Sequence, residues 1–244
     1  MPFALNVMRL AILFSGQGQQ TAEHLGFLRE HVGKSSAAAL KNALGMAWTE
    51  RDPPINELSA NVIAQPLIFG FEMLWWERLA PYLPTPICAA GYSLGEMAAC
   101  SAAGLFSECA GIALCHERAK LMDANTSGDV TMLAVLGIGE EKVAEVSSQF
   151  GLEMAIRNSP THFVVTGTVA AINGAVDRFQ AAGASKLTPV AVRTPSHTRF
   201  LRAASEAFAK TLEPYSQGNL MFPVISAVSS GEFSCNGQMI VCLP

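Results

Sequence analysis

Short apolar runs alternate along the chain with stretches whose apolar residues recur at helical spacing. Strands are predicted where an apolar run ends at a turn, at 9–14, 87–90 and 224–228. Helices are predicted where apolar residues recur every three to four positions, at 61–79, 96–103, 108–125 and 198–212. The first two strands each lead into a glycine-containing loop, and α/β proteins bind ligands in such loops at the carboxyl ends of parallel strands.

The middle of the chain has a different order of elements. From position 128 its pattern predicts β-α-β-β-α-β, with elements at 130–138, 140–150, 152–157, 163–167, 169–182 and 187–192. This is the order of a ferredoxin-like unit. We therefore expect a large α/β core formed by 1–127 and 191–244, interrupted by a ferredoxin-like small subdomain at 128–190.

Composition excludes several classes of protein. Of the 244 residues, 15% are charged and 50% are hydrophobic, which excludes a disordered chain and favours strands buried on both faces of a mostly parallel sheet. The uncharged stretches are too short to span a membrane and the N-terminal residues lack the pattern of a secretory signal, so we expect a cytoplasmic protein. A net charge of −4 without a basic run argues against nucleic-acid binding. The six cysteines form no C-x-x-C pair, so neither a metal site nor a disulfide framework is expected.

The candidate nucleophile is Ser93. It lies in Gly91-x-Ser93-x-Gly95 between the strand at 87–90 and the helix at 96–103. This is the context of a nucleophile elbow, a turn so tight that glycines flank the serine and its hydroxyl projects above the sheet. The alternative is an ordinary turn in which the serine caps the helix. Both interpretations predict a helix that starts here.

A serine hydroxyl needs a base, and the chain has five histidines: His24, His31, His116, His162 and His197. We choose His197, because it follows Ser196, an expected N-cap, where the 198–212 helix begins. The positive end of the helix dipole would keep its ring neutral and able to accept a proton. A histidine with only a surface or capping role is the alternative.

Arg118 is the candidate cation. It lies on the 108–125 helix beside an apolar stripe, and its neighbours three and four positions away are all apolar or cysteine, so it has no local carboxylate. Such a side chain either extends along the apolar surface to water or meets an anion from elsewhere in the fold or from a ligand.

Four segments together carry a family resemblance: Ser15–Gln20 after the first strand, Gly91–Glu96, His116–Met122 and Pro195–His197. In order and spacing the chain resembles the malonyl-CoA:acyl carrier protein transacylase family over nearly its whole length. Within it, the chain looks most like the transacylase (epsilon) subunit of malonate decarboxylases. The resemblance implies an α/β fold with a hydrolase-like core, a mostly parallel sheet and an inserted ferredoxin-like α+β subdomain.

The resemblance also implies the residue roles. Ser93 matches the acylated nucleophile, His197 its base, and Arg118 the guanidinium that holds the malonyl carboxylate. The backbone N–H groups of Gln17 and Leu94 match the oxyanion hole; a plain turn residue is the alternative for Gln17. The implied reaction is ping-pong malonyl transfer from malonyl-CoA to the thiol of an acidic acyl carrier protein, with no metal or other cofactor. We expect the carrier to dock near Arg193, Arg199 and Arg202, which flank the base in sequence.

The chain departs from the family pattern at its C-terminal end. Family members usually continue for several dozen residues past the strand at 224–228, into a segment with a Gly-Pro-Gly turn that orients the catalytic histidine. Here the sequence ends at Pro244 after a stretch without clear periodicity. Two alternatives to transfer follow: a serine esterase or thioesterase that uses Ser93 and His197, and an inactive, shortened subunit that binds without forming an ester.

Overall fold

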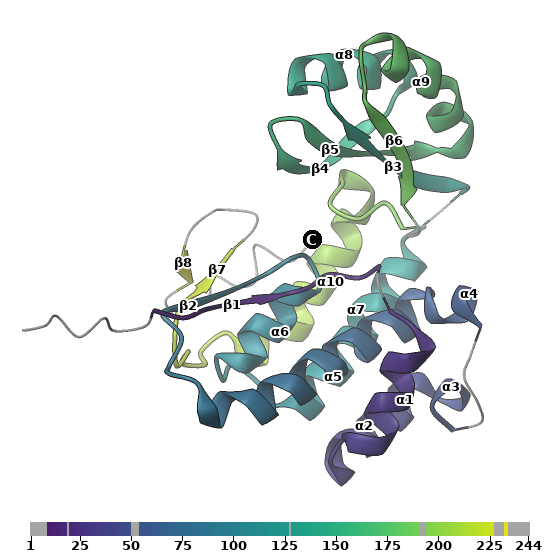
Figure 1. Cartoon of the computed structure of the whole chain (residues 1–244). Coiled ribbons are helices and arrows are strands. Elements are labelled where there is room, and N and C mark those ends of the chain that lie inside the picture. The colour runs from purple at the N-terminus through teal and green to yellow at the C-terminus, as the bar shows by residue number, and fades with distance from the viewer. Residues whose placement is uncertain are drawn as a thin grey trace, which may run out of the picture. The chain divides into compact units, whose positions relative to one another are not determined.

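The chain forms two compact units, drawn in Figure 1. The computed structural model describes residues 9–18, 20–49, 54–126, 128–190, 194–226 and the backbone of 232–233. Unit 1 contains the described residues up to Ala119 and from Ala209 onward, and unit 2 contains those from Lys120 to Phe208. The chain therefore passes from unit 1 into unit 2 within one helix, α7 (Glu108–Ala124), and returns within another, α10 (Arg202–Leu212).

Unit 1 is built on a mostly parallel sheet. Its strand order is β1-β2-β7-β8, with β1 at Ala11–Phe14, β2 at Cys88–Gly91, β7 at Val224–Ile225 and β8 at Glu232–Phe233. The first three strands are parallel, and β8 is antiparallel to β7. Phe14 is in register with Gly91, so the loops that follow β1 and β2 leave the sheet at the same edge. The predicted strand at 224–228 is confirmed for its first two residues, and 227–228 lie outside the described residues.

Helix α5 (Asn61–Leu79) forms the centre of the helical layer of unit 1, and its observed bounds are the predicted ones. It is apolar on most sides because other helices surround it: α1 (Ala22–His31), α2 (Lys34–Leu44) and α6 (Gly95–Ala102) all contact it. Leu67 and Phe69 are fully buried in this layer. Between 21 and 60, where the apolar pattern predicts no element, the chain forms α1, α2 and two short helices, α3 (Met46–Thr49) and α4 (Ile55–Leu58). A 3-10 turn, η1 (Ala80–Tyr82), follows α5.

Unit 2 contains the predicted ferredoxin-like order of elements. These are β3 (Val130–Leu136), α8 (Glu140–Phe150), β4 (Glu153–Ser159), β5 (His162–Thr168), α9 (Val169–Ala181) and β6 (Lys186–Val190). The strands pair antiparallel in the order β4-β5-β3-β6, so the two central strands are the first and third of the unit. The bounds of the small subdomain, 128–190, stay a prediction, since the compact unit also takes in the end of α7 and the start of α10.

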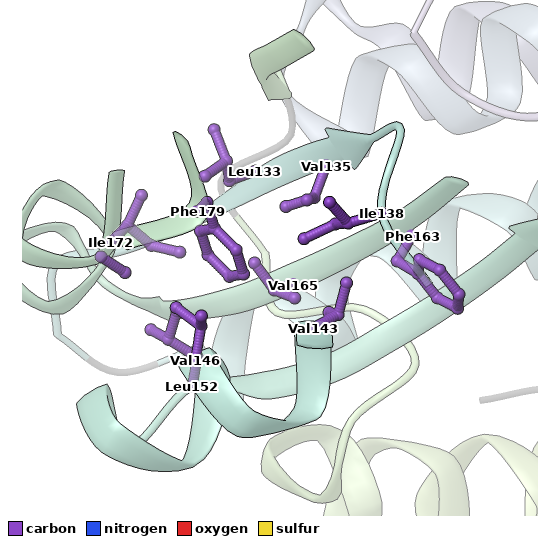
Figure 2. Close-up of a cluster of buried hydrophobic side chains, with 11 residues drawn as sticks. Leu133, Val135, Ile138, Val143, Val146, Leu152, Phe163, Val165, Ile172 and Phe179 are labelled. Carbon is purple, nitrogen blue, oxygen red and sulfur yellow. The ribbon is translucent and has the colours of Figure 1, made fainter. Parts of the chain in front are cut away.

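One apolar cluster holds the small sheet and its helices together. Figure 2 shows side chains from the strands and from both helices gathered in the space between them. Phe163, Phe179, Val135 and Val143 are fully buried there. Removing their apolar surface from water stabilises the folded subdomain by about 25 cal/mol per Å² buried. None of the described helices of the chain combines the length and hydropathy that a transmembrane span requires.

Candidate active site

Ser93 lies on a strained turn between β2 and α6. Its φ is 54°, in the left-handed region that costs a non-glycine residue about 1–3 kcal/mol. Two backbone hydrogen bonds close the turn: Gly95 N–H donates to Tyr92 O at 3.1 Å, and Glu96 N–H donates to Ser93 O at 3.0 Å. The N-cap of α6 is Leu94, without a side-chain capping bond, so Ser93 is not the capping serine of the alternative interpretation. The geometry is that of a nucleophile elbow.

The glycines beside Ser93 are required by close backbone contacts. A Cβ at Gly91 would overlap the carbonyl group of Gly95 and the nitrogen of Glu96. A Cβ at Gly95 would lie 2.5 Å from the carbonyl oxygens of both Phe14 and Ser15. The elbow is thus packed directly on the end of β1, and this explains why the sequence has glycine on both sides of the serine.

The loop after β1, residues 15–18, lies beside the elbow. Tyr92 N–H donates to Phe14 O at 3.1 Å, which fixes the start of the loop to the start of the turn. The Gln17 side chain donates through Nε2 to Asn61 Oδ1 at 2.9 Å and to Ser59 O at 3.5 Å. Gln17 therefore anchors the loop to the start of α5 and is more than a plain turn residue. The proposed oxyanion role of its backbone N–H, and of that of Leu94, stays a prediction.

The Arg118 side chain is buried beside the serine. It is 2% exposed, so the interpretation in which it extends to water is wrong. Nη1 donates to Oε1 of the fully buried Gln65 at 2.8 Å, and Nη2 donates to Ser93 Oγ at 3.4 Å. Nε is buried and has no hydrogen-bond partner among the described residues. Because Gln65 occupies Nη1, the edge formed by Nε and Nη2 is the one left for a planar acceptor, and it lies next to the serine oxygen.

The electrostatics of Arg118 favour an anionic ligand. Burial lowers the pKa of its guanidinium, while Cys115 and Glu96 raise it, and arginine side chains stay protonated in proteins. In the described part of the chain no carboxylate lies within salt-bridge distance of it. A buried charge without a direct counterion is costly. A carboxylate that enters the site relieves this cost.

His197 belongs to unit 2, whereas Ser93 and Arg118 belong to unit 1. The structure brings the serine and the guanidinium together, and the approach of the imidazole to the serine stays a prediction. The backbone of His197 is in the left-handed region, with a φ of 63°. Among the described residues, Ser93 and His197 are the two non-glycine residues with positive φ. Strained residues concentrate at functional sites, so this observation supports the choice of both.

The structure corrects the prediction that Ser196 is the N-cap of a helix that begins next to His197. The predicted helix at 198–212 begins as a 3-10 turn, η2 (Arg199–Leu201), with Thr198 as its N-cap, and α10 starts only at Arg202. Ser196 is therefore not an N-cap; its N–H donates instead to Thr194 O at 2.7 Å within a tight turn. Since the α-helix begins five positions after His197, the argument from the helix dipole does not hold for this ring.

The other candidate groups have different surroundings. His116 Nδ1 lies 3.3 Å from Val62 O, and His162 Nε2 lies 3.4 Å from Asn158 Nδ2 in the small sheet. Burial raises the pKa of the Cys100 thiol to about 12 and raises that of Cys115 further, so both are inert, buried thiols. No group of three or more potential metal ligands is found in the described residues.

Sequence reasoning missed two polar residues of α5. Gln65, the acceptor for Arg118, and Glu72, which accepts from Ser15, both face inward on a helix that reads as almost wholly apolar. The polar residues themselves were the signal, because a buried polar side chain in an apolar helix needs a hydrogen-bond partner. Its partner could not be found from the sequence, since α7 and the loop after β1 are distant along the chain.

A strained serine between a strand and a helix, beside a buried guanidinium, is the arrangement typical of α/β enzymes that use a serine nucleophile. A family model described as "Acyl transferase domain" matches residues 12–239, so the chain belongs to this family.

Similarity to known proteins supports this family assignment. The malonyl CoA-acyl carrier protein transacylase of Haemophilus influenzae is 30% identical over 84% of this chain and 69% of its own length. The polyketide biosynthesis protein ThaF of Burkholderia thailandensis is 30% identical over 93% of this chain, which spans 20% of that much longer protein. A solved structure described as a "type II PKS acyl-carrier protein in complex with its malonyl-transacylase" is 27% identical, with a TM-score of 0.84 over 97% of this chain and 80% of that one. The predicted family and the predicted fold class are both confirmed.

Proposed function

We propose that this chain transfers a malonyl group from malonyl-CoA to the thiol of an acyl carrier protein, with Ser93 as the nucleophile. The observation that carries the proposal is the buried Arg118 guanidinium, whose Nη2 lies 3.4 Å from Ser93 Oγ and whose Nε is left for a second acceptor. A malonyl group differs from an acetyl group by one carboxylate. A site with a buried cation at that distance from the nucleophile favours the acyl group that carries the anion.

The transfer has two chemical halves. Ser93 Oγ attacks the thioester carbonyl while His197 takes its proton, the C–S bond breaks, and the proton goes to the departing CoA sulfur. The carrier thiol then gives its proton to His197 and attacks the malonyl ester, and Ser93 Oγ leaves with that proton. The N–H groups of Gln17 and Leu94 stabilise the oxyanion in both halves, and each such donor contributes about 3–4 kcal/mol. No other cofactor takes part.

The partner in the second half is an acidic carrier protein. The relatives named above support this acceptor, since one is a malonyl CoA-acyl carrier protein transacylase and another is held in complex with a carrier protein. We place the docking surface near Arg199 and Arg202. The Arg199 side chain is 78% exposed, so its guanidinium can meet a carrier carboxylate although its Nε lies 3.3 Å from the partly buried Glu153. Arg193, the third predicted residue, lies outside the described residues. Transfer rates that are insensitive to salt would exclude this docking.

Mass spectrometry of the Ser93 peptide tests the proposal against the two alternatives. After mixing with malonyl-CoA, transfer predicts a malonyl adduct on Ser93 that persists in buffer and is discharged by a pantetheine thiol. Rapid loss of the adduct to water would support the esterase or thioesterase. Absence of any adduct would support the binding subunit, and Ser93→Ala is the control that locates the adduct. The assignment to a malonate decarboxylase stays a prediction, tested by transfer to that enzyme's own carrier subunit.

A further inference from the structure

Glu72, on the fourth turn of α5, holds the first residue of the loop after β1. One carboxylate oxygen, Oε1, accepts from the Ser15 backbone N–H at 2.6 Å and from the Ser15 hydroxyl at 2.7 Å. Both distances are at the short end for hydrogen bonds, as expected when the acceptor is ionised. The two residues are 57 positions apart in sequence, so the contact ties two distant segments of unit 1 together.

The same loop is held from its other side by the elbow. A Cβ at Gly16 would lie 2.7 Å from Tyr92 O and 2.8 Å from a ring carbon of Tyr92, so the loop backbone runs in direct contact with the residue before Ser93. A Cβ at Gly95 would lie 2.5 Å from the carbonyl oxygen of Ser15. Ser15 therefore lies between the Glu72 carboxylate, to which it is hydrogen-bonded, and the turn that contains Ser93. Gln17 follows two residues further along the same loop, so the position of Ser15 limits the positions open to the Gln17 backbone.

The surroundings make Glu72 sensitive to its protonation state. It lines an apolar cavity of about 300 Å³ together with Phe14, Trp75 and Trp76. Its second oxygen, Oε2, is buried without a hydrogen-bond partner among the described residues. Burial raises the pKa of the carboxyl group to about 7, although both Ser15 bonds lower it. The titratable groups that face it from other elements are His24 of α1, which also lines the cavity, and the Cys115 thiol of α7, which interacts with it electrostatically.

We propose that Glu72 is a positioning residue: through its two hydrogen bonds to Ser15 it holds the 15–18 loop against the elbow, where the Gln17 N–H serves the oxyanion. The inference deepens the proposed function and rests on it. Loss of one oxyanion donor slows such enzymes by about 10²- to 10³-fold, and a donor that is present but loosely held loses a fraction of that. The ionised carboxylate positions the loop best, because charge-assisted bonds are about twice as strong as neutral ones.

Rapid-mixing acylation of the full chain by malonyl-CoA, together with hydrogen exchange, tests the inference. Glu72→Ala is expected to slow Ser93 acylation about tenfold, with the apparent KM for malonyl-CoA changed less than about twofold, since the loop acts on the transition state. Amide exchange in the peptide covering 15–18 is expected to rise at the same time. Glu77→Ala, on the exposed side of the same helix, is the matched control and leaves both quantities unchanged.

Glu72→Gln separates positioning from a structural role. Its amide oxygen still accepts from Ser15 but carries no charge, so the ratio of wild-type to variant acylation rates is expected to rise severalfold between about pH 6 and pH 8. Titration of His197 affects both proteins and cancels in the ratio. A ratio that stays constant with pH, or unchanged 15–18 exchange in Glu72→Ala, overturns the inference. Failure of the proposed function is a different result: the wild-type chain would form no adduct at Ser93.

Discussion

The buried guanidinium of Arg118 gives the sharpest test of acyl-group selectivity. Replacing Arg118 with Ala removes the Nε and Nη2 donors next to Ser93 Oγ. A two-point bond between arginine and a carboxylate in a sheltered site contributes about 2–3 kcal/mol, which corresponds to about 30- to 150-fold in rate. We therefore expect kcat/KM for malonyl-CoA to fall by that factor, while kcat/KM for acetyl-CoA changes less than about threefold.

The assay measures transfer of both acyl groups to the same carrier protein by each variant. Arg118→Lys is the matched control, because it keeps the charge and loses the planar pair of donors, and an intermediate loss is expected. Arg118→Ala also removes the hydrogen bond to the buried Gln65 Oε1, which costs about 1–3 kcal/mol of stability, so rates are compared at a temperature where both proteins are folded. Equal losses for malonyl and acetyl transfer would show that Arg118 supports the fold and does not read the substrate.

Four further outcomes follow from the geometry of the site. Ser93→Gly removes a hydroxyl from a residue at φ 54° and is expected to raise Tm while abolishing the malonyl adduct; a lower Tm would argue against strain at the elbow. Gly95→Ala forces a Cβ to 2.5 Å from two carbonyl oxygens and is expected to destabilise unit 1 by about 1–3 kcal/mol in urea unfolding, whereas Gly26→Ala, in an open part of α1, does not. Gln65→Leu frees Nη1 of Arg118 and is expected to reduce the preference for malonyl over acetyl, without loss of Ser93 acylation by acetyl-CoA. Because burial raises the pKa of the Glu72 carboxyl to about 7, the folded chain binds the carboxyl proton more tightly than the unfolded chain, and wild-type stability falls as pH rises from 4.5 to 7. Glu72→Gln lacks this titration, so its Tm relative to that of the wild type is expected to increase over that range. A Tm difference that stays constant with pH would refute the raised pKa.

Local pattern was sufficient for the elements whose neighbours in sequence decide their structure. The bounds of α5 and the β-α-β-β-α-β order of 130–190 follow from apolar periodicity that matches the observed burial. The turn at Ser93 could be predicted because its glycines are a local steric requirement. The helices between 22 and 58 were missed, since their apolar faces are short and are completed only by packing on other helices: α1, α2 and α4 contact α5, and α3 contacts α2. The helix start after His197 was predicted too early, because Thr198 caps a 3-10 turn and Ser196 bonds within its own turn.

By itself the sequence determined where the candidate nucleophile, base and cation stand along the chain, because glycine spacing and apolar periodicity are properties of neighbouring residues. Only the tertiary structure decided what Arg118 does. Whether that side chain reaches water or turns inward depends on α5 and on the elbow, and these lie 53 and 25 positions away in sequence. The same holds for the Ser15–Glu72 contact across 57 positions. Burial and partners over such separations are set by the packing of whole elements, and no local pattern encodes them.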